Sequence, residues 1–266
     1  MGEESVRAHA LIQARMGSKR LPGKVLRMVE GKPLLSYMLD RLKYSQKLSS
    51  MVLLSSTEKE NDALEIFALD YGISCCRGPE NDVLERYALA SKAMSLKDDE
   101  WIVRLTGDCP LLDPRIMDRL LAIAESGEYD YLANTAPPPG FYPDGMDVEI
   151  FSVKNLKRAA HEAILPSERE HVTFYFWKNP EIFRLYLDKI ESDFSNYRFT
   201  VDYFEDFEYF GKIVRDLLQK NPLASMKELI EWADTHPEES QYQGTLLKNA
   251  GWMESLLCDQ RMKGNG

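Results

Sequence analysis

The chain has 266 residues, of which 44% are hydrophobic and 29% are charged, the composition of an ordinary globular protein with a substantial core. Its net charge of −10 argues against nonspecific binding to nucleic acid or to an anionic membrane surface. The N-terminal residues lack the apolar core of a signal peptide, and no stretch approaches the roughly 18 apolar residues that span a bilayer. We therefore expect a cytoplasmic protein with neither nucleic acid nor membrane as a partner.

The first 135 residues alternate between short apolar runs and segments with helical spacing. The apolar runs are His9–Gln13, Met51–Ser55, Ile73–Cys76 and Trp101–Thr106, and the helical segments are Pro33–Lys43, Asn61–Tyr71, Asp82–Met94 and Pro114–Ser126. This alternation predicts βαβ units and an α/β fold with a mostly parallel central sheet, flanked by helices on both faces. Asn61 and Asp62 are expected to cap the second helix, and Asp113 to cap the fourth.

The pattern changes after Asn134. The stretch TAPPPGFYPDG, rich in proline and glycine, predicts a loop. The elements expected after it are a strand at Asp147–Phe151, helices near Asn155–Ile164 and Ser167–Trp177, strands at Phe183–Leu187 and Phe199–Val201, and a helix at Phe204–Lys220. Two amphipathic stretches, Met226–Ala233 and Thr245–Leu257, follow in the tail. They could pack on the domain, form an oligomer contact or fray.

The segment after the first predicted strand, LIQARMGSKRLPGKVL (Leu11–Leu26), gathers positive charge on an acidic chain. It combines four cations with three small residues: Arg15, Lys19, Arg20, Lys24, Gly17, Ser18 and Gly23. A glycine lets the backbone approach a ligand closely, and exposed backbone amides can cradle an anion. The loop is neither GxxxxGK[ST] nor GxGxxG. Because ligands bind outside the carboxyl ends of parallel strands, we predict a polyphosphate-binding loop, with a solvated basic turn as the alternative.

Two aspartates directly follow apolar runs. Asp108 lies in RLTGDCPLLDP, just past the fourth run, and Asp202 lies in RFTVDYFEDFEYF. Magnesium usually needs only one or two protein carboxylates, together with phosphate oxygens and water, so Asp108 suits a Mg²⁺ site. The alternative for Asp108 is an aspartate in an ordinary strand-to-helix turn. Glu205 and Asp206 are expected to cap the following helix.

These motifs resemble those of the cytidylyltransferases that make CMP-sugar acids, including the CMP-Kdo and CMP-sialic acid synthetases. The run QARMGSKRLPGKVL followed by GKPLL is most similar to the branch named SpsF-like spore coat polysaccharide biosynthesis proteins. The resemblance extends in pieces from Ala10 to about Leu218. It implies a Rossmann-like nucleotide-diphospho-sugar transferase fold, with a nucleotidyltransferase domain at 1–222. The tail is outside the resemblance, and we expect it to form a helical extension at 223–266. An acceptor-binding and dimerisation region is implied at about 135–198, and a homodimer stays open because relatives are often dimers.

The resemblance also implies the chemistry. CTP would be the donor, Mg²⁺ the cofactor, and a small anionic acceptor, such as an acidic sugar or a phosphorylated small acid, would receive CMP as pyrophosphate leaves. In the family, the first aspartate of TVDxxED joins that of the GDxP turn on the metal, which assigns Asp108 and Asp202. Phe204 stands where relatives commonly have proline. The residues implied to be catalytic are Arg15, Lys24 and Asp108.

The remaining site residues are carried over from the same relatives. The triphosphate would be held by Arg15, Ser18 and Lys24, with Ala14, Gly17, Lys19 and Arg20 around it. The cytosine and ribose would contact Ser55, Thr57, Gly78, Asp82 and Arg86, although each of these could equally be a cap or a surface ion pair. Thr106, at the strand mouth beside Asp108, would also bind the nucleotide. The acceptor would contact Arg104, Asp144, Asp147, Glu149, Arg169, Glu170 and His171. Glu170 and His171 could instead belong to a surface helix with one buried histidine.

Two other functions remain as alternatives. A nucleotide-sugar-dependent glycosyltransferase would use a similar sheet and a metal aspartate, but a DxD triplet at the end of a strand would favour it and the sequence has none. A non-catalytic nucleotide sensor would be expected to lack a metal carboxylate, whereas Asp108 and Asp202 are both present. The sequence therefore favours a nucleotidyltransferase.

Overall fold

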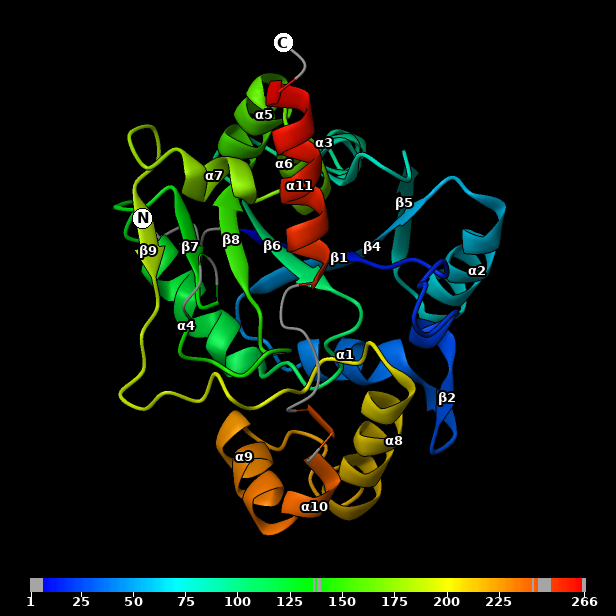
Figure 1. Ribbon diagram of the computed structural model, residues 1–266. Helices are drawn as coiled ribbons and strands as arrows, with labels where there is room; N and C mark the ends of the chain where they lie inside the picture. The colour runs from blue at the N-terminus through cyan, green and yellow to red at the C-terminus, as the bar shows by residue number, and fades with distance from the viewer. Residues whose placement is uncertain (1–6, 136, 138–139, 241, 244–249, 265–266) are drawn as a thin grey trace.

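A seven-stranded sheet forms the centre of the computed structural model, which describes residues 7–135, 137, 140–240, 242–243 and 250–264 (Figure 1). The strand order is β5-β4-β1-β6-β8-β7-β9. These strands are β1 (Ala8–Gln13), β4 (Leu48–Ser56), β5 (Ser74–Gly78), β6 (Trp101–Thr106), β7 (Tyr131–Ala133), β8 (Glu149–Ser152) and β9 (Leu185–Leu187). A separate antiparallel pair joins β2 (Met28–Val29) to β3 (Lys32–Pro33).

The helices lie on both faces of the sheet. They are α1 (Leu34–Leu42), α2 (Asp62–Tyr71), α3 (Val83–Ala93), α4 (Pro114–Ala124), α5 (Val153–Glu162), α6 (Pro166–His171), α7 (Phe174–Lys178), α8 (Phe204–Ile213), α9 (Met226–Thr235), α10 (Pro237–Ser240) and α11 (Ala250–Gly264). Short helical turns occur at η1 (Lys24–Leu26), η2 (Lys59–Asn61) and η3 (Val214–Leu218). None of the helices within the described ranges is long and apolar enough to cross a membrane. The predicted α/β fold is confirmed.

Strands β5, β4, β1 and β6 are parallel, as the alternating sequence predicts. The chain moves from β1 to β4 and β5 on one side and then returns to place β6 on the other side of β1. Such a reversal opens a crevice at the carboxyl ends of the two strands. Gln13 of β1 pairs with Thr106 of β6, so the loops that leave these strands begin side by side.

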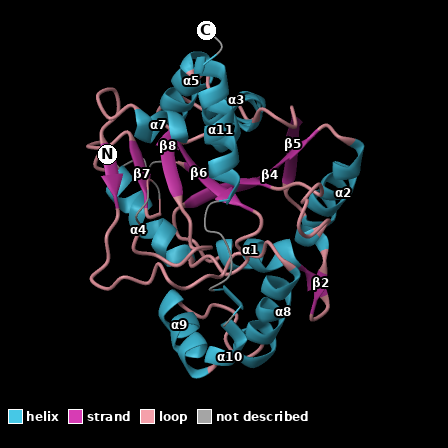
Figure 2. Cartoon of the chain, viewed as in Figure 1, coloured by secondary structure: helices cyan, strands magenta, loops and turns pink. Residues whose placement is uncertain are grey.

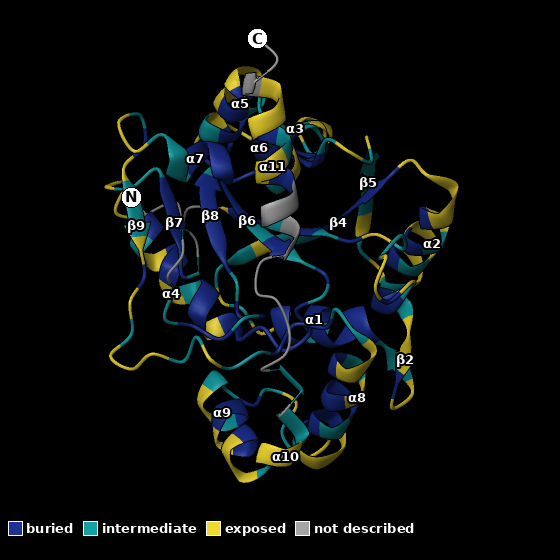
Figure 3. Ribbon diagram, in the orientation of Figure 1, coloured by how far each residue is buried: buried dark blue, intermediate teal, exposed yellow. Residues whose placement is uncertain are grey.

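The central strands are largely buried (Figure 3). Their alternate side chains pack into two hydrophobic cores, one on each face of the sheet. Ala10 and Ile12 of β1 face the core shared with α1 and α4, whereas Leu11 faces the core shared with α3 and α5. Burial on both faces explains why the central strands are continuous apolar runs. On the far side of α1, helices α8, α9 and α10 form a further layer, where Tyr37 meets Phe210 edge to face with ring centroids 5.1 Å apart (Figure 1).

The second half of the chain departs from the predictions in several places. Strand β7 was not predicted, because three residues carry too little periodicity to detect. Strand β8 begins at Glu149 and runs antiparallel to β6. Asp147 therefore lies in the preceding loop, and the prediction that it begins the strand is wrong. The single helix predicted over Ser167–Trp177 is also wrong, since it divides into α6 and α7 at Val172, whose φ is 59°.

The strand predicted at Phe199–Val201 is likewise wrong. Figure 2 shows the chain between β9 and α8 as loop, and an isolated bridge between Asp144 and Arg198 is the one β-type pairing recorded outside the named strands in the described part of this segment. Helix α8 begins at Phe204 as expected, but it passes into a π-helical turn, η3, before the predicted end at Lys220.

The capping predictions have mixed outcomes. Asp113 caps α4 through its bond from the Arg115 amide, and Asp206 caps α8 by accepting from the amides of Asp202 and Tyr203. Asn61 does not cap α2 through its side chain, so that prediction is wrong. Its side chain is used elsewhere, as described below.

The tail returns to the body of the protein at two places. The buried guanidinium of Arg41 donates to the carbonyls of Pro222 and Ala224, at 2.8 Å each, just before α9. Helix α11 packs against α6, where Asp259 accepts from the amide and the hydroxyl of Ser167 at 2.9 and 2.5 Å and from Lys178 at 3.3 Å. The Thr245–Leu257 prediction lies partly outside the described residues, and the part that is described belongs to α11.

Candidate active site

The loops that follow β1 and β6 meet at the carboxyl ends of these paired strands. The Gly107 amide donates to the Gln13 carbonyl at 2.8 Å, which extends the pairing past both strand ends. A Cβ added at Gly107 would lie 3.0 Å from Cβ of Ala14 and 3.3 Å from the Gln13 carbonyl oxygen. This close approach places two segments side by side. One is the basic loop, the part of Leu11–Leu26 that follows β1, and the other is the turn that carries Asp108.

The basic loop is folded upon itself. The carbonyl of Met16 accepts from the amides of Ser18 and Gly23, at 2.9 Å each, and Gly23 has a φ of 67° that favours glycine. The Ser18 hydroxyl accepts from the Leu21 amide at 3.3 Å and keeps its own proton to donate. The Met16 amide donates at 2.8 Å to Asn61, which in turn donates to the Ser56 hydroxyl at 2.7 Å. Asn61 thus anchors the loop to the end of β4.

Lys24 joins the two aspartates predicted to hold a metal. Its Nζ lies 2.8 Å from Asp108 Oδ2 and 2.8 Å from Asp202 Oδ1, and its side chain is only 8% exposed. Burial alone would lower the pKa of Lys24, but the two carboxylates outweigh that effect and raise it. Burial would raise the pKa of Asp202, yet Lys24 and Arg20 hold it well below its ordinary value. Asp108 and Asp202 are therefore arranged to balance a positive charge placed between them.

This pair is the part of the protein best suited to a divalent metal. Among the described residues, no three histidine, cysteine, aspartate or glutamate side chains are grouped to hold an ion by themselves. Two carboxylates facing a basic loop nevertheless fit magnesium, which takes most of its ligands from phosphate and water. The Lys24 ammonium between them shows that the pair accommodates positive charge.

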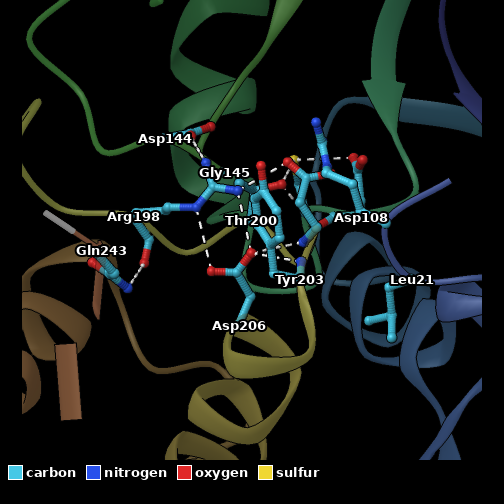
Figure 4. Close-up of polar contacts among 12 residues, drawn as sticks. Leu21, Asp108, Asp144, Gly145, Arg198, Thr200, Tyr203, Asp206 and Gln243 are labelled. Atoms are coloured by element: carbon cyan, nitrogen blue, oxygen red, sulfur yellow. Dashed lines mark hydrogen bonds and ion pairs between the residues drawn. The ribbon is translucent and has the colours of Figure 1, made fainter. Parts of the chain in front are cut away.

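A strap formed by residues 197–202 brings Asp202 to Asp108, and Figure 4 shows Thr200 of this strap beside Asp108. The Val201 amide and the Thr200 hydroxyl donate to the Asp108 carbonyl at 2.8 and 3.2 Å. The Phe199 amide donates to the Asp144 carbonyl at 2.7 Å, so the strap also borders the turn at Gly145. Two carboxylates that are 94 positions apart in the sequence are thereby fixed close together.

Gly145 leaves no room for a side chain. Its φ is 97°, and an added Cβ would lie 2.5 Å from the Thr200 amide nitrogen and 2.6 Å from the Phe199 carbonyl carbon. Because the obstructing atoms are backbone, we expect Gly145→Ala to cost about 2 kcal/mol or more and to lower Tm by roughly 5 °C. Thermal unfolding followed by circular dichroism measures this. Gly127→Ala is the control, since Gly127 has a φ of 70° but nothing within 4 Å of the added carbon. Equal losses in both variants would contradict the steric argument.

On the other side of the basic loop, several buried polar groups lack partners. Arg86 is 4% exposed, and its Nε and Nη1 have no hydrogen-bond partner among the described residues. Ser55 is fully buried, and its hydroxyl also has no hydrogen-bond partner among the described residues. The same is true of Oε2 of Glu80. Burial lowers the pKa of Arg86, partly opposed by Glu80. Since buried polar groups are normally hydrogen-bonded, these atoms are available to a ligand.

Arg15 connects this region to the basic loop. Its Nη1 lies 3.1 Å from Oε1 of Glu80, and half of its side chain is exposed. The nearby backbone is built by β4 and β5, where the Thr57 amide donates to the Gly78 carbonyl at 3.0 Å. A Cβ at Gly78 would lie 2.8 Å from Cγ of Arg86, so glycine lets Arg86 pack against the strand end.

The residues predicted to contact the acceptor separate into three groups. Asp144 and Asp147 lie at the Gly145 turn, and burial raises the pKa of each, with the Asp147 carboxylate contributing at Asp144. The carboxylates of Asp202 and Asp108 raise the pKa of Asp144 further, and Asp108 also raises that of Asp147. This group belongs to the crevice.

The second group lies within the sheet. Arg104 of β6 pairs with Glu149 of β8, its direct neighbour across the strands. Glu149 also accepts from the Tyr131 hydroxyl at 2.5 Å, and Arg104 Nε has no partner within the described residues. Both carboxylate oxygens of Glu149 are therefore engaged within the sheet, whereas Arg104 has donors left for a ligand.

The third group lies on α6. Arg169 Nη2 lies 2.5 Å from Oδ2 of Asp82, the residue that caps α3. Asp82 was predicted to contact the nucleotide, and this ion pair occupies its carboxylate. His171 Nε2 lies 2.9 Å from the Ser255 hydroxyl of α11, and Glu170 also contacts that hydroxyl. The structure therefore does not bring Arg169, Glu170 and His171 together with Asp108 and Asp202.

Sequence reasoning missed Asn61, Glu80 and Arg198. Glu80 lies in RGPEND, directly after β5, so its position at a strand exit was a usable signal. Asn61 resembled a helix cap, and Arg198 lies in an irregular segment, where no helix or strand spacing relates it to Asp202 and Asp206. Neither had a local signal for its role.

Several known proteins are similar to this chain over all or part of its length. A family described as Cytidylyltransferase matches residues 9–250. The chain is 31% identical over 240 residues to the spore coat polysaccharide biosynthesis protein SpsF of Bacillus subtilis, covering 86% of this chain and 94% of SpsF. A cytidylyltransferase structure from Leptospira borgpetersenii superimposes with a TM-score of 0.81 at 36% identity, covering 89% of this chain and 97% of that one. The 3-deoxy-manno-octulosonate cytidylyltransferase 2 of Hydrogenovibrio crunogenus is 29% identical over 126 residues, or 47% of this chain and 50% of that protein.

Proposed function

The chain belongs to the cytidylyltransferase family, and on that premise we propose that this nucleotidyltransferase moves CMP from CTP to a small anionic acceptor with release of pyrophosphate. The observation that carries the proposal is the cluster of charged side chains at the carboxyl ends of β1 and β6. There the basic loop faces Asp108 and Asp202, with Lys24 Nζ 2.8 Å from both carboxylates.

The triphosphate would lie along the basic loop. Arg15 offers an exposed guanidinium fork, Ser18 has a hydroxyl proton to donate, and Lys24 supplies a point charge. Ala14, Gly17, Lys19 and Arg20 would line the same path. The nucleoside would extend towards β4 and β5, where Arg86 and Ser55 have unsatisfied polar atoms. Thr57, Gly78 and Thr106 border this side.

Asp108 and Asp202 would hold Mg²⁺, which would supply positive charge to the phosphates when bound. In the reaction, an acceptor oxygen forms a bond to the α-phosphorus, and the bond from that phosphorus to the bridging oxygen breaks. Pyrophosphate leaves with the electron pair. Arg15 and Lys24 stabilise the charge on the departing phosphates, so catalysis depends on positioning and electrostatics rather than on a covalent intermediate.

The acceptor would approach from the Gly145 turn. Asp144 and Asp147 border Asp108 and Asp202, and their carboxylates suit the hydroxyl groups of a sugar. The relative from Hydrogenovibrio crunogenus is named for a sugar acid, and SpsF is named for polysaccharide biosynthesis. An acidic sugar or a phosphorylated small acid in surface polysaccharide or glycoconjugate synthesis fits both names. We place this acceptor-binding role within residues 135–198 and the nucleotidyltransferase domain at 1–222.

A pyrophosphate-release screen tests the proposal. The purified chain is incubated with Mg²⁺ and CTP, UTP, ATP or GTP against a panel of acidic sugars and phosphorylated acids. We expect pyrophosphate with CTP and at least one anionic acceptor, and much less with the other nucleotides. Release of sugar from a nucleotide sugar, with no pyrophosphate from CTP, would support the glycosyltransferase alternative. CTP binding without turnover across the panel would support the sensor.

A further inference from the structure

We propose that Arg198 is a positioning residue that fixes Asp202 in the orientation needed to bind the metal. The inference rests on the proposed function, because Asp202 is the proposed metal ligand. It concerns a residue that touches neither phosphate nor metal in that scheme and acts through the carboxylate beside it.

The two oxygens of Asp202 are divided between two sets of cations. Oδ1 faces the basic loop, 2.8 Å from Lys24 Nζ and 2.8 Å from Arg20 Nη2. Oδ2 faces away from that loop and lies 2.9 Å from Arg198 Nη2. Arg198 thus binds Oδ2 of Asp202 and leaves Oδ1 directed at the proposed polyphosphate site.

Arg198 is itself held rigidly (Figure 4). Its guanidinium also contacts Asp144 and lies 3.2 Å from Asp206 Oδ2, and its side chain is only 12% exposed. Asp206 is 1% exposed at the side chain and accepts from the Asp202 amide at 2.8 Å. A single planar group therefore connects the Gly145 turn, the strap and the first turn of α8.

This arrangement suits arginine and not lysine. A guanidinium presents several N–H donors in a fixed plane, so it can hold three carboxylates at once, whereas an ammonium is a single flexible point charge. Residues that orient a metal-binding carboxylate typically change metal affinity by about 10–100-fold when they are replaced. Arg198→Lys keeps the charge and removes the fork, which isolates the orienting role.

Mn²⁺ binding in the presence of CTP tests the role directly. Free Mn²⁺ is followed by electron paramagnetic resonance as the full chain is titrated, and CTP binding without metal is measured by calorimetry. We expect Arg198→Lys to raise the Mn²⁺ dissociation constant at least ~10-fold. The CTP affinity without metal should change less than about 3-fold, since the basic loop is untouched. Thermal unfolding shows whether the variant is folded.

Arg184→Gln is the matched control, because Arg184 pairs with Asp130 through two contacts at 2.8 and 3.1 Å but lies on an exposed edge. It should leave Mn²⁺ binding unchanged. Arg198→Gln, which removes the charge as well, should weaken Mn²⁺ binding at least as much as Arg198→Lys.

Unchanged Mn²⁺ affinity in a folded Arg198→Lys protein would overturn the inference and leave the proposed function intact. A lower Tm with native Mn²⁺ affinity would also overturn it, since it would reduce Arg198 to a structural role. A wild-type chain that binds no Mn²⁺ with CTP would instead contradict the proposed function, and the inference would fall with it.

Discussion

Asp108→Asn is expected to reduce the rate of CMP transfer at least ~100-fold, the scale observed when one preorganised charged contact is removed from an active site. The substitution keeps the shape of the side chain and removes its charge. Lys24 Nζ would still bond Asp202 at 2.8 Å, so the loop should stay in place. Initial rates of pyrophosphate release at saturating CTP and Mg²⁺ measure the effect.

Asp98→Asn provides the control. Asp98 precedes β6, whereas Asp108 follows it, so the two aspartates lie at opposite ends of the strand. Asp98 forms an exposed ion pair with Lys157 at 2.6 Å. Its replacement should leave the rate within about 2-fold, because exposed ion pairs contribute little. Near-normal turnover in Asp108→Asn would refute the assignment of the metal pair.

Arg15→Ala is expected to lower the rate by a similar factor of at least ~100 without destabilising the fold. Half of the Arg15 side chain is exposed, and its one recorded ion pair joins Glu80 at 3.1 Å. Surface substitutions of this kind usually change the free energy of unfolding by less than about 0.5 kcal/mol. Arg15→Ala should therefore lower the rate of CMP transfer and leave Tm nearly unchanged. This makes Arg15 the most direct test of the basic loop.

Two further variants distinguish the possible causes. Arg27→Ala removes an exposed arginine that follows the same loop and donates to the Pro22 carbonyl at 3.3 Å. If loss of general positive charge explained the effect, Arg27→Ala would reproduce it. Glu80→Gln removes the partner of Arg15 and should cost far less than Arg15→Ala, because it leaves the guanidinium in place. Equal losses in Arg15→Ala and Arg27→Ala would contradict a specific role for Arg15.

The parallel half of the sheet was predictable because local pattern and global position agree there. Strands buried on both faces appear as short apolar runs, and Trp101–Thr106 has the same limits in the sequence prediction and in β6. The later elements lack that signal. Val172 adopts a φ of 59° for which its β-branched side chain has no preference, so no propensity rule predicts the break between α6 and α7.

The candidate site shows the same division. The basic loop and Asp108 were visible because both follow predicted strands, and the family resemblance added Asp202. The direct contact of Lys24 with both aspartates was not predicted, nor was the role of Arg198. These features depend on backbone contacts between segments that are remote in the sequence, such as the Val201 amide with the Asp108 carbonyl at 2.8 Å.

The docking of α11 on α6 has a practical bearing on protein engineering. Asp259 satisfies both the amide and the hydroxyl of Ser167, 92 positions earlier, and it is 5% exposed. A shortened chain that ended at residue 222, where the sequence suggests a domain boundary, would strip α6 of this carboxylate and leave the Lys178 charge uncompensated. Crystallisation variants and fusion proteins should consequently retain the final helix.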